Sequence, residues 1–153
     1  MKIQDLQNGD LLFTVGQSAM AAAIRTSTGS YSHVGIFFDG DIYHATQDKG
    51  VNHQPLSQFL EEEDIYHVFT YPEIDVSAAF KEAKSHMGKP YNASFYPESE
   101  GFYCSEYIAR ILPIFETIPM QFADGENAVS EFWQAYYEDL GVDVPVGQAG
   151  TNP

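Results

Sequence analysis

Two β-prone runs, residues 31–38 and 41–45, are separated only by the dipeptide Asp39-Gly40. Asp-Gly in a two-residue loop is a strong signal for a β-hairpin, because this tight turn needs backbone angles that few other residues adopt. The loop length also fixes the register, so that Phe38 pairs with Asp41 and Gly35 with His44. The sequence therefore predicts an antiparallel hairpin with a defined pairing of residues.

The predicted register brings two histidines together. Side chains alternate between the two faces of a strand, so His33, Gly35 and His44 share one face of the hairpin. His33 and His44 are then diagonal neighbours, about 7–8 Å apart at the backbone and within reach of each other's side chains. Gly35 opposite His44 leaves open space between the rings. A loop longer or shorter by one residue would put the two rings on opposite faces.

The chain has one cysteine, Cys104, where an aromatic stretch meets the first turn of a predicted helix. A single thiol cannot form a disulfide within the chain. The start of a helix brings unpaired N–H groups and the positive end of the helix dipole to the sulfur, which favours the nucleophilic thiolate. The alternative is that Cys104 is a small apolar residue of the core, because free cysteines are often buried.

A thiol, an imidazole that deprotonates it and a polar group that orients the imidazole make up a nucleophilic cysteine site. We predict Cys104 as the nucleophile, His33 as the general base and His44 as the acceptor of a hydrogen bond from His33. A neutral imidazole orients its partner less strongly than a carboxylate, so the thiolate population should be sensitive to pH. The alternative is that each histidine is an ordinary residue with a satisfied hydrogen bond.

These residues lie in segments that resemble the YiiX/YebB-like branch of the permuted NlpC-type, papain-like cysteine hydrolases. In chain order, the segments are residues 9–13, 31–36, 43–45, 50–60, 88–91, 103–108 and 145–153. The most specific pieces are the Ser-His-Val-Gly-Ile run at 32–36 and the Tyr-Cys-Ser-Glu run at 103–106. In this family the histidine strand precedes the cysteine helix, as His33 precedes Cys104. Similar chains run on a little beyond Pro153, so a short C-terminal piece is expected to be missing or dispensable.

The resemblance implies an α+β, circularly permuted papain-like fold over residues 1–153 as one domain. A small antiparallel sheet or partial barrel would pack against helices, with the nucleophile at a helix N-terminus. The resemblance also implies an acyl-enzyme mechanism, in which Cys104 attacks a carbonyl and His33 carries the proton to the leaving group. Water or a second nucleophile then releases the acyl group. No cofactor and no metal are expected for this chemistry.

One position departs from the YiiX-like pattern, where relatives commonly carry a glutamate in place of His44. The related lecithin retinol acyltransferase-like proteins use a second histidine there.

The expected function is a thiol amidase or peptidase acting on small peptides or cell-wall-type peptide stems. An acyltransferase or lipid-ester thiol enzyme and a non-catalytic ligand-binding domain are alternatives. A zinc-binding domain is another, because one thiolate and two imidazoles from Cys104, His33 and His44 would leave an open fourth position on the metal.

The oxyanion of such a reaction needs hydrogen-bond donors. The backbone N–H of Cys104 is one predicted donor, and a tyrosine hydroxyl is the other. Tyr91 and Tyr31 are candidates because they adjoin the matched motifs, and Tyr103 is a further candidate for substrate binding. The chain has ten tyrosines, so ordinary packing is the alternative for each. We also predict that the irregular aromatic segment 91–103 forms a substrate-binding lip and that Glu106 caps the cysteine helix.

Charge narrows the range of partners. The chain carries 22 acidic and 7 basic residues, a net charge of −15. This charge disfavours phosphate backbones and anionic membrane surfaces, so a small-molecule or peptide substrate is expected and nucleic acid is not. No run approaches the ~20 apolar residues of a membrane span, and the first ten residues lack the apolar region of a targeting signal. The chain is therefore expected to be cytoplasmic as written, or periplasmic or secreted if a leader has been removed.

Hydrophobic spacing predicts the remaining elements, and an apolar content of 44% supports a single core. Helices are expected within residues 16–25, at 55–63, from Asp75 to Gly88, from Cys104 to Pro113 and near 127–140. A polar loop is expected at 26–30 and a strand at 65–70.

Overall fold

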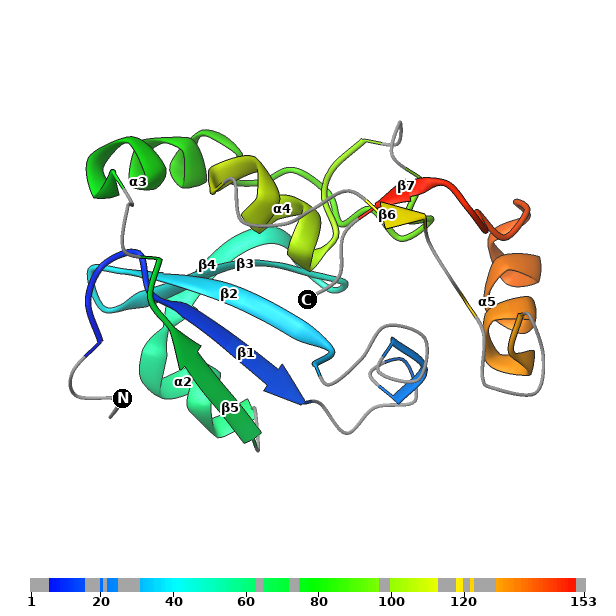
Figure 1. Ribbon diagram of the computed structural model, residues 1–153, viewed down its shortest axis with the longest axis horizontal. Helices are drawn as coiled ribbons and strands as arrows, with labels where there is room; N and C mark the ends of the chain where they lie inside the picture. Colours follow the sequence, from blue (N-terminus) through cyan, green and yellow to red (C-terminus); the bar gives the residue numbers. More distant parts are fainter. Residues whose placement is uncertain are drawn as a thin grey trace.

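The computed structural model describes residues 6–15, 20, 22–24, 31–62, 65–71, 75–96, 100–112, 118–119, 122 and 129–150. Five strands form the central sheet: β1 (Leu11–Val15), β2 (His33–Phe38), β3 (Asp41–Thr46), β4 (Gly50–Pro55) and β5 (Ile65–Phe69). Their order is β4-β3-β2-β1-β5, and every neighbouring pair is antiparallel. Two short strands, β6 (Ile118–Pro119) and β7 (Ala149–Gly150), pair with each other away from this sheet (Figure 1).

The β2–β3 hairpin has the predicted register. Phe38 pairs with Asp41, and the turn residues Asp39 and Gly40 have φ angles of 49° and 88°. Both angles are positive, as the tight type I′ turn requires. A Cβ atom built on Gly35 would lie 3.4 Å from the Cβ of His44, so Gly35 does face His44. The prediction of the hairpin is confirmed.

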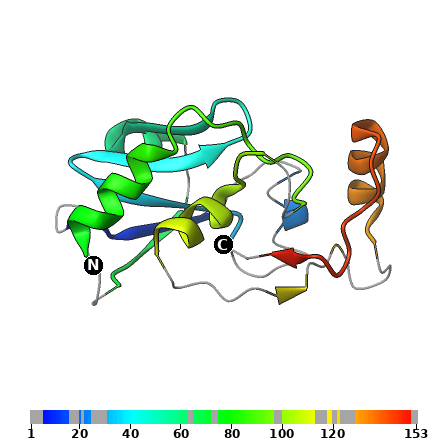
Figure 2. The same ribbon diagram turned by 90° about the horizontal axis from the view of Figure 1, so that it is seen from above.

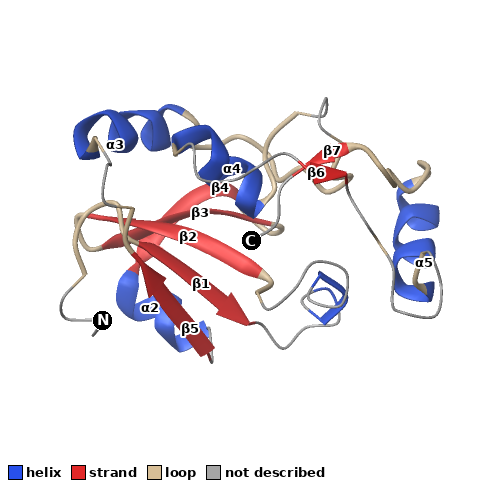
Figure 3. Cartoon of the chain, viewed as in Figure 1, coloured by secondary structure: helices blue, strands red, loops and turns tan. Residues whose placement is uncertain are grey.

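Helices cover both faces of the sheet (Figures 1 and 3). Helices α3 (Val76–Ser85) and α4 (Cys104–Ile111) lie over one face, and α2 (Leu56–Glu62) lies against the other. Helix α5 (Glu131–Leu140) stands apart from the sheet, as the view from above also shows (Figure 2). Within the described ranges, no helix has the length and apolar character needed to cross a membrane.

Alternating residues of β2 contribute to two different apolar clusters. Val34, Ile36 and Phe38 pack with residues of α3 and α4. Phe37 packs on the opposite side, in the cluster around Phe59 of α2. Both faces of the strand are therefore covered, which the continuous apolar character of the hairpin requires. A third cluster, around Trp133, belongs to α5.

Most of the predicted elements are confirmed, including α2, β5, α3 and the cysteine helix α4. The last helix begins at Glu131, later than predicted, because the Ser130 hydroxyl accepts the backbone N–H of Trp133 and caps the helix at that point. Residues 20 and 22–24 are helical, whereas the rest of the predicted helix at 16–25, the loop at 26–30 and Pro113 lie outside the described residues. Strands β1, β4, β6 and β7 were not predicted.

Candidate active site

His33 and His44 are joined directly. Nε2 of His33 lies 2.9 Å from Nδ1 of His44, and the ring centroids are 5.0 Å apart. Both rings contact Phe59 of α2, and His44 is only 3% exposed. The predicted contact between the two imidazoles is confirmed, whereas their catalytic roles stay a prediction.

The environment keeps both imidazoles neutral. Burial lowers the pKa of His33 to about 4. Burial is also the largest cause of the lowered pKa of His44, followed by the nearby His33. A neutral imidazole can accept a proton, and this is the first requirement for a general base at pH 7. Low pKa values also oppose a lasting imidazolium, so the site favours a thiol next to a neutral imidazole over a preformed ion pair.

Cys104 is the first residue of α4, and Tyr103 is the N-cap. The predicted position of the cysteine at a helix N-terminus is therefore confirmed. The thiol is buried, and its Sγ atom lies 3.9 Å from the carbonyl oxygen of Ser32. Ser32 directly precedes His33, so the thiol lies next to the start of β2.

The thiol and the imidazole pair approach this point from opposite faces of the sheet. Cys104 belongs to the apolar cluster of Val34, Ile36 and the helices α3 and α4. The two histidines lie on the other face, against Phe59. What joins the two groups along the chain is Ser32, whose carbonyl oxygen lies beside Sγ and which directly precedes His33. Because His33 binds His44 through Nε2, its Nδ1 atom is the nitrogen that remains for the thiol proton.

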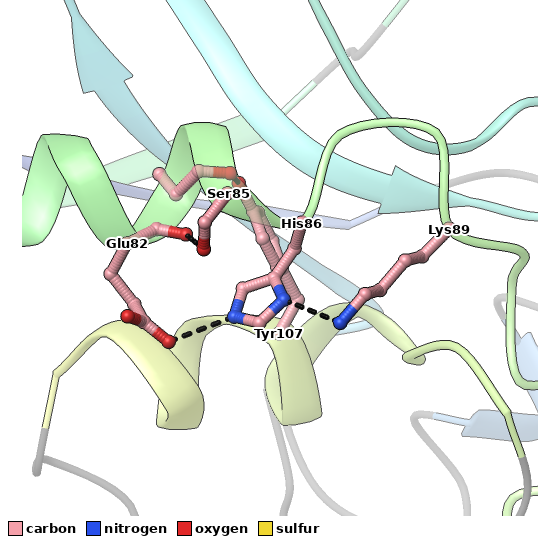
Figure 4. Close-up of polar contacts among 6 residues, drawn as sticks. Glu82, Ser85, His86, Lys89 and Tyr107 are labelled. Carbon is pink, nitrogen blue, oxygen red and sulfur yellow. Dashed lines mark hydrogen bonds and ion pairs between the residues drawn. The ribbon is translucent and has the colours of Figure 1, made fainter.

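Helix α4 is held to α3 by a buried hydrogen bond, in which the Tyr107 hydroxyl donates to the carbonyl oxygen of Ala83 over 2.9 Å. Figure 4 shows a second network at the C-terminal end of α3, where His86 lies between Glu82 and Lys89. Each of the two His86 ring nitrogens lies 2.8 Å from one of these partners. Carboxylates accept and ammonium groups donate, so Nε2 carries the proton toward Glu82 and Nδ1 accepts from Lys89. These bonds fix the end of α3 and the turn that leads to Tyr91.

Glu106 closes the start of the cysteine helix. Its carboxylate accepts the backbone N–H of Tyr103 and the side-chain amide of Asn92, each over 3.2 Å. Burial raises the pKa of Glu106, and these hydrogen bonds act in the opposite direction. The prediction that Glu106 caps the helix is confirmed.

The candidate tyrosines lie in two places. Tyr91 packs against the apolar cluster that contains Cys104 and forms a bridge with Phe102. Burial, and after it the charge of Cys104, raise the pKa of Tyr91 well above the ordinary value for tyrosine. Tyr103 adjoins Cys104 in the chain and is almost fully buried. Tyr31 belongs to the aromatic group of β1 and β5, where its hydroxyl lies 2.7 Å from Nδ1 of His67 and its ring packs against Phe13. Tyr91 and Tyr103 thus belong to the part of the structure around Cys104, whereas the Tyr31 hydroxyl is bonded to His67.

The predicted lip is irregular over the described residues 91–96 and 100–103, while residues 97–99 lie outside them. A bridge between Tyr91 and Phe102 closes its base. Helix α5 holds its outer part, because the hydroxyls of Tyr136 and Tyr137 donate to the carbonyl oxygens of Ala93 and Ser94. The sequence analysis did not single out these bonds, since nothing in the spacing of tyrosines tells which hydroxyls reach a distant loop.

A cysteine at the start of a helix, preceded in the chain by a histidine strand of the sheet beneath it, is the arrangement of the permuted papain-like fold. The chain belongs to the YaeF/YiiX family of permuted papain-like amidases (the C92 family), whose model matches residues 5–124. Among solved structures it is similar to the metalloprotein YiiX from Escherichia coli O157:H7, with a TM-score of 0.81 and 24% identity. That match covers 96% of this chain and 89% of the other, and it confirms the fold predicted from the sequence. The comparison with curated proteins found no match.

Proposed function

We propose that this protein is a thiol amidase that forms an acyl-enzyme at Cys104, with His33 as the general base and small peptides or cell-wall-type peptide stems as substrates. The observation that carries the proposal is the neutral His33–His44 pair at the strand start that the thiol adjoins. The family is one of amidases, which supports attack on an amide carbonyl. The neutral charge state suits His33 to accept a proton in the first step.

The proposed cycle has two halves. In the first, the sulfur of Cys104 bonds to the amide carbon and its proton passes to Nδ1 of His33. The carbon–nitrogen bond then breaks, and His33 gives the proton to the departing amine. In the second, a water molecule attacks the thioester while His33 takes one of its protons. The carbon–sulfur bond breaks, the carboxylic acid leaves and His33 returns the proton to the thiolate.

The oxyanion of each tetrahedral intermediate needs donors that are already in place. The backbone N–H of Cys104 is the first proposed donor, because Cys104 is the first residue of α4 and the first N–H groups of a helix are not used within the helix. Tyr91 is the proposed second donor. Its raised pKa keeps the hydroxyl protonated at neutral pH, and its packing against the cluster that contains Cys104 supports this role.

The charge balance supports a cationic or zwitterionic substrate. A net charge of −15 repels polyanions and attracts free amino groups. The two imidazoles are neutral at neutral pH, so they carry no positive charge that would oppose the negative field of the protein at the site.

Metal binding and acyl transfer are the competing functions. The solved relative YiiX is described as a metalloprotein. Across the described ranges, however, no three His, Cys, Asp or Glu side chains gather so that they could hold a metal ion. The described residues therefore do not fit the zinc site proposed for Cys104, His33 and His44. Acyl transfer is favoured by one observation, the histidine at position 44, and would differ only in the group that attacks the thioester.

The rate of Cys104 alkylation by iodoacetamide from pH 4 to 9 tests the proposal, with intact-mass detection on this single-thiol chain. We expect alkylation below the ~8.5 of a free thiol to be faster than that of an ordinary cysteine, because the neutral His33 takes the proton as the sulfur attacks, and we expect this excess to be lost in His33→Ala. A slow rate that rises only near 8.5, equal in both proteins, would refute the proposal.

A screen of amide and ester substrates with added amines or alcohols, with Cys104→Ala as the blank, then separates hydrolysis from transfer. Stoichiometric zinc that is lost in Cys104→Ala would instead establish the metal-binding alternative.

A further inference from the structure

Two buried side-chain atoms beside the imidazole pair lack a hydrogen bond among the described residues: Oγ1 of Thr14, which pairs with His33 across β1 and β2, and Nε2 of His44. In the described part of the chain, Nε2 of His44 is inaccessible to solvent and lacks a hydrogen-bond partner. Leaving a buried donor unpaired costs about 1–3 kcal/mol, so a group of this kind in a native fold calls for an explanation.

The proton on His44 decides whether His33 can act as a base. In the bond between Nε2 of His33 and Nδ1 of His44, one nitrogen donates and the other accepts. If His44 carries its proton on Nε2, its Nδ1 accepts from His33, and Nδ1 of His33 keeps a free lone pair. If His44 carries its proton on Nδ1, His33 must carry its own proton on Nδ1 and cannot take one from the thiol. The catalytic arrangement therefore requires a proton on the buried Nε2 atom.

Asn52 is placed to select this tautomer. Asn52 of β4 pairs directly with His44 of β3, so both side chains lie on the same face of the sheet. The Asn52 side-chain nitrogen donates to Oγ1 of Thr46 over 2.9 Å and to the carbonyl oxygen of Gly50 over 2.8 Å. A carbonyl oxygen can only accept, so the amide nitrogen must be on that side. The amide oxygen is then left to face the other way.

We propose that Asn52 is a positioning residue whose Oδ1 atom accepts the Nε2 proton of His44 and so holds His33 in its basic tautomer. The catalytic consequence rests on the proposed function, whereas the tautomer itself does not. Burial and His33 lower the pKa of His44, while the Asn52 side chain acts in the opposite direction, as an acceptor near its N–H group should. Lys49, in the turn before β4, lowers this pKa further and so also favours the neutral ring.

The backbone around Asn52 is held in place. Gly50 has a φ of 70°, and a Cβ atom there would collide with the carbonyl oxygen of Lys89. The N–H of Val51 donates to this same oxygen over 2.8 Å. The carbonyl that fixes the Asn52 amide therefore belongs to a packed segment, and the amide has little freedom to turn over.

The tautomer can be measured without catalysis. In Cys104→Ala protein at pH 7, long-range ¹⁵N–¹H spectra report which ring nitrogen of His44 carries the proton, with the signals assigned by their loss in His44→Gln. We expect the proton on Nε2 in this parent, and the Nδ1 form as a major or mixed species after Asn52→Leu. Asn8→Leu is the control, because Asn8 bonds Asp39 in the hairpin turn, away from His44. A proton on Nδ1 in the parent, or no change in Asn52→Leu, would overturn the proposal.

A milder variant guards against a failure to fold. Thr46→Val keeps Asn52 but removes one of the two bonds that set its amide, and it should give a partial shift toward the Nδ1 form. An unchanged tautomer in a folded Thr46→Val protein, together with an unfolded Asn52→Leu protein, would count against the proposal.

Reactivity of the native thiol adds a second measurement. With Cys104 present, Asn52→Leu should slow alkylation at pH 7 about tenfold, and Asn52→Asp, which keeps an acceptor oxygen, should restore much of the rate. If the thiol of the unaltered protein reacts as an ordinary cysteine, the proposed function fails while the tautomer result still stands. If the thiol is activated but indifferent to Asn52, the positioning role fails alone.

Discussion

Nε2 of His33 lies 2.9 Å from Nδ1 of His44, so an imidazole stands where a carboxylate would orient the base more strongly. A carboxylate has no proton of its own to place, whereas His44 has two possible positions for its proton. The site therefore depends on its surroundings for the correct tautomer, as well as for its geometry.

Replacing His44 by glutamate, the residue that YiiX-like relatives commonly carry, should preserve activity within about tenfold, because a carboxylate also accepts the Nε2 proton of His33. The negative charge should raise the pKa of His33 from its value of about 4, and the acid limb of the kcat/KM profile should move to higher pH. Rate profiles of His44→Glu and of His44→Leu, which has no acceptor, test this. A folded but inactive His44→Glu protein would show that His44 has another task.

Stability should depend on His33 in weakly acidic solution. Its pKa falls from 6.5 to about 4 on folding, so between these values the unfolded chain binds more protons than the native one. The contribution is complete above pH 6.5, declines as the pH falls and amounts to about 3 kcal/mol in all. Urea unfolding of the wild type and of His33→Gln from pH 4 to 8 should show a shallower decline in the variant. Equal slopes would mean that folding leaves the pKa of His33 unchanged.

Tyr91→Phe should lower kcat about 10²-fold while leaving the alkylation rate of Cys104 unchanged, because an oxyanion donor acts only once the carbonyl is attacked. Tyr31→Phe is the matched control, since its hydroxyl lies against His67. We expect Tyr31→Phe to retain nearly full kcat. Equal losses in the two variants would contradict the assignment of Tyr91.

Gly101→Ala should destabilise the fold by on the order of 2 kcal/mol more than Gly88→Ala. The φ angle is 80° at Gly101 and 86° at Gly88, so an alanine incurs a similar backbone strain at either position. Only at Gly101 does a Cβ atom meet the carbonyl of Pro90, whereas the space around Gly88 is open. Thermal unfolding of the two variants compares them, and a similar loss in both would show that the loop can shift to make room.

The hairpin and the cysteine helix could be predicted because local chemistry specifies them. Asp39-Gly40 fixes both the turn and its register, and the two histidines follow from the alternation of side chains. Strand β4 could not be predicted, since its sequence Gly-Val-Asn-His-Gln-Pro is mostly polar and forms a strand only by pairing with β3. Asn52 was missed for the same reason, because its partner His44 becomes apparent only in that pairing.

The tyrosine candidates show the limit of reasoning from neighbouring motifs. Tyr31 and Tyr91 each adjoin a matched segment, yet Tyr91 packs against the cluster that contains Cys104, whereas the Tyr31 hydroxyl is bonded to His67. Where a side chain at the end of a strand turns depends on which residues pack around it, and for Tyr31 these are Phe13, His67 and Phe69. Contacts of this kind join distant parts of the chain, and sequence spacing does not encode them.

The bonds from Tyr136 and Tyr137 to Ala93 and Ser94 tie the predicted lip to a helix outside the matched part of the chain. The family match ends at residue 124, before α5, yet α5 holds the outer part of the predicted lip. Substitutions of Tyr136 and Tyr137 would therefore release the outer part of the predicted lip without altering helix α4, which carries Cys104. If the lip binds substrate as predicted, Tyr136→Phe and Tyr137→Phe should change substrate selectivity while leaving the reactivity of Cys104 unchanged.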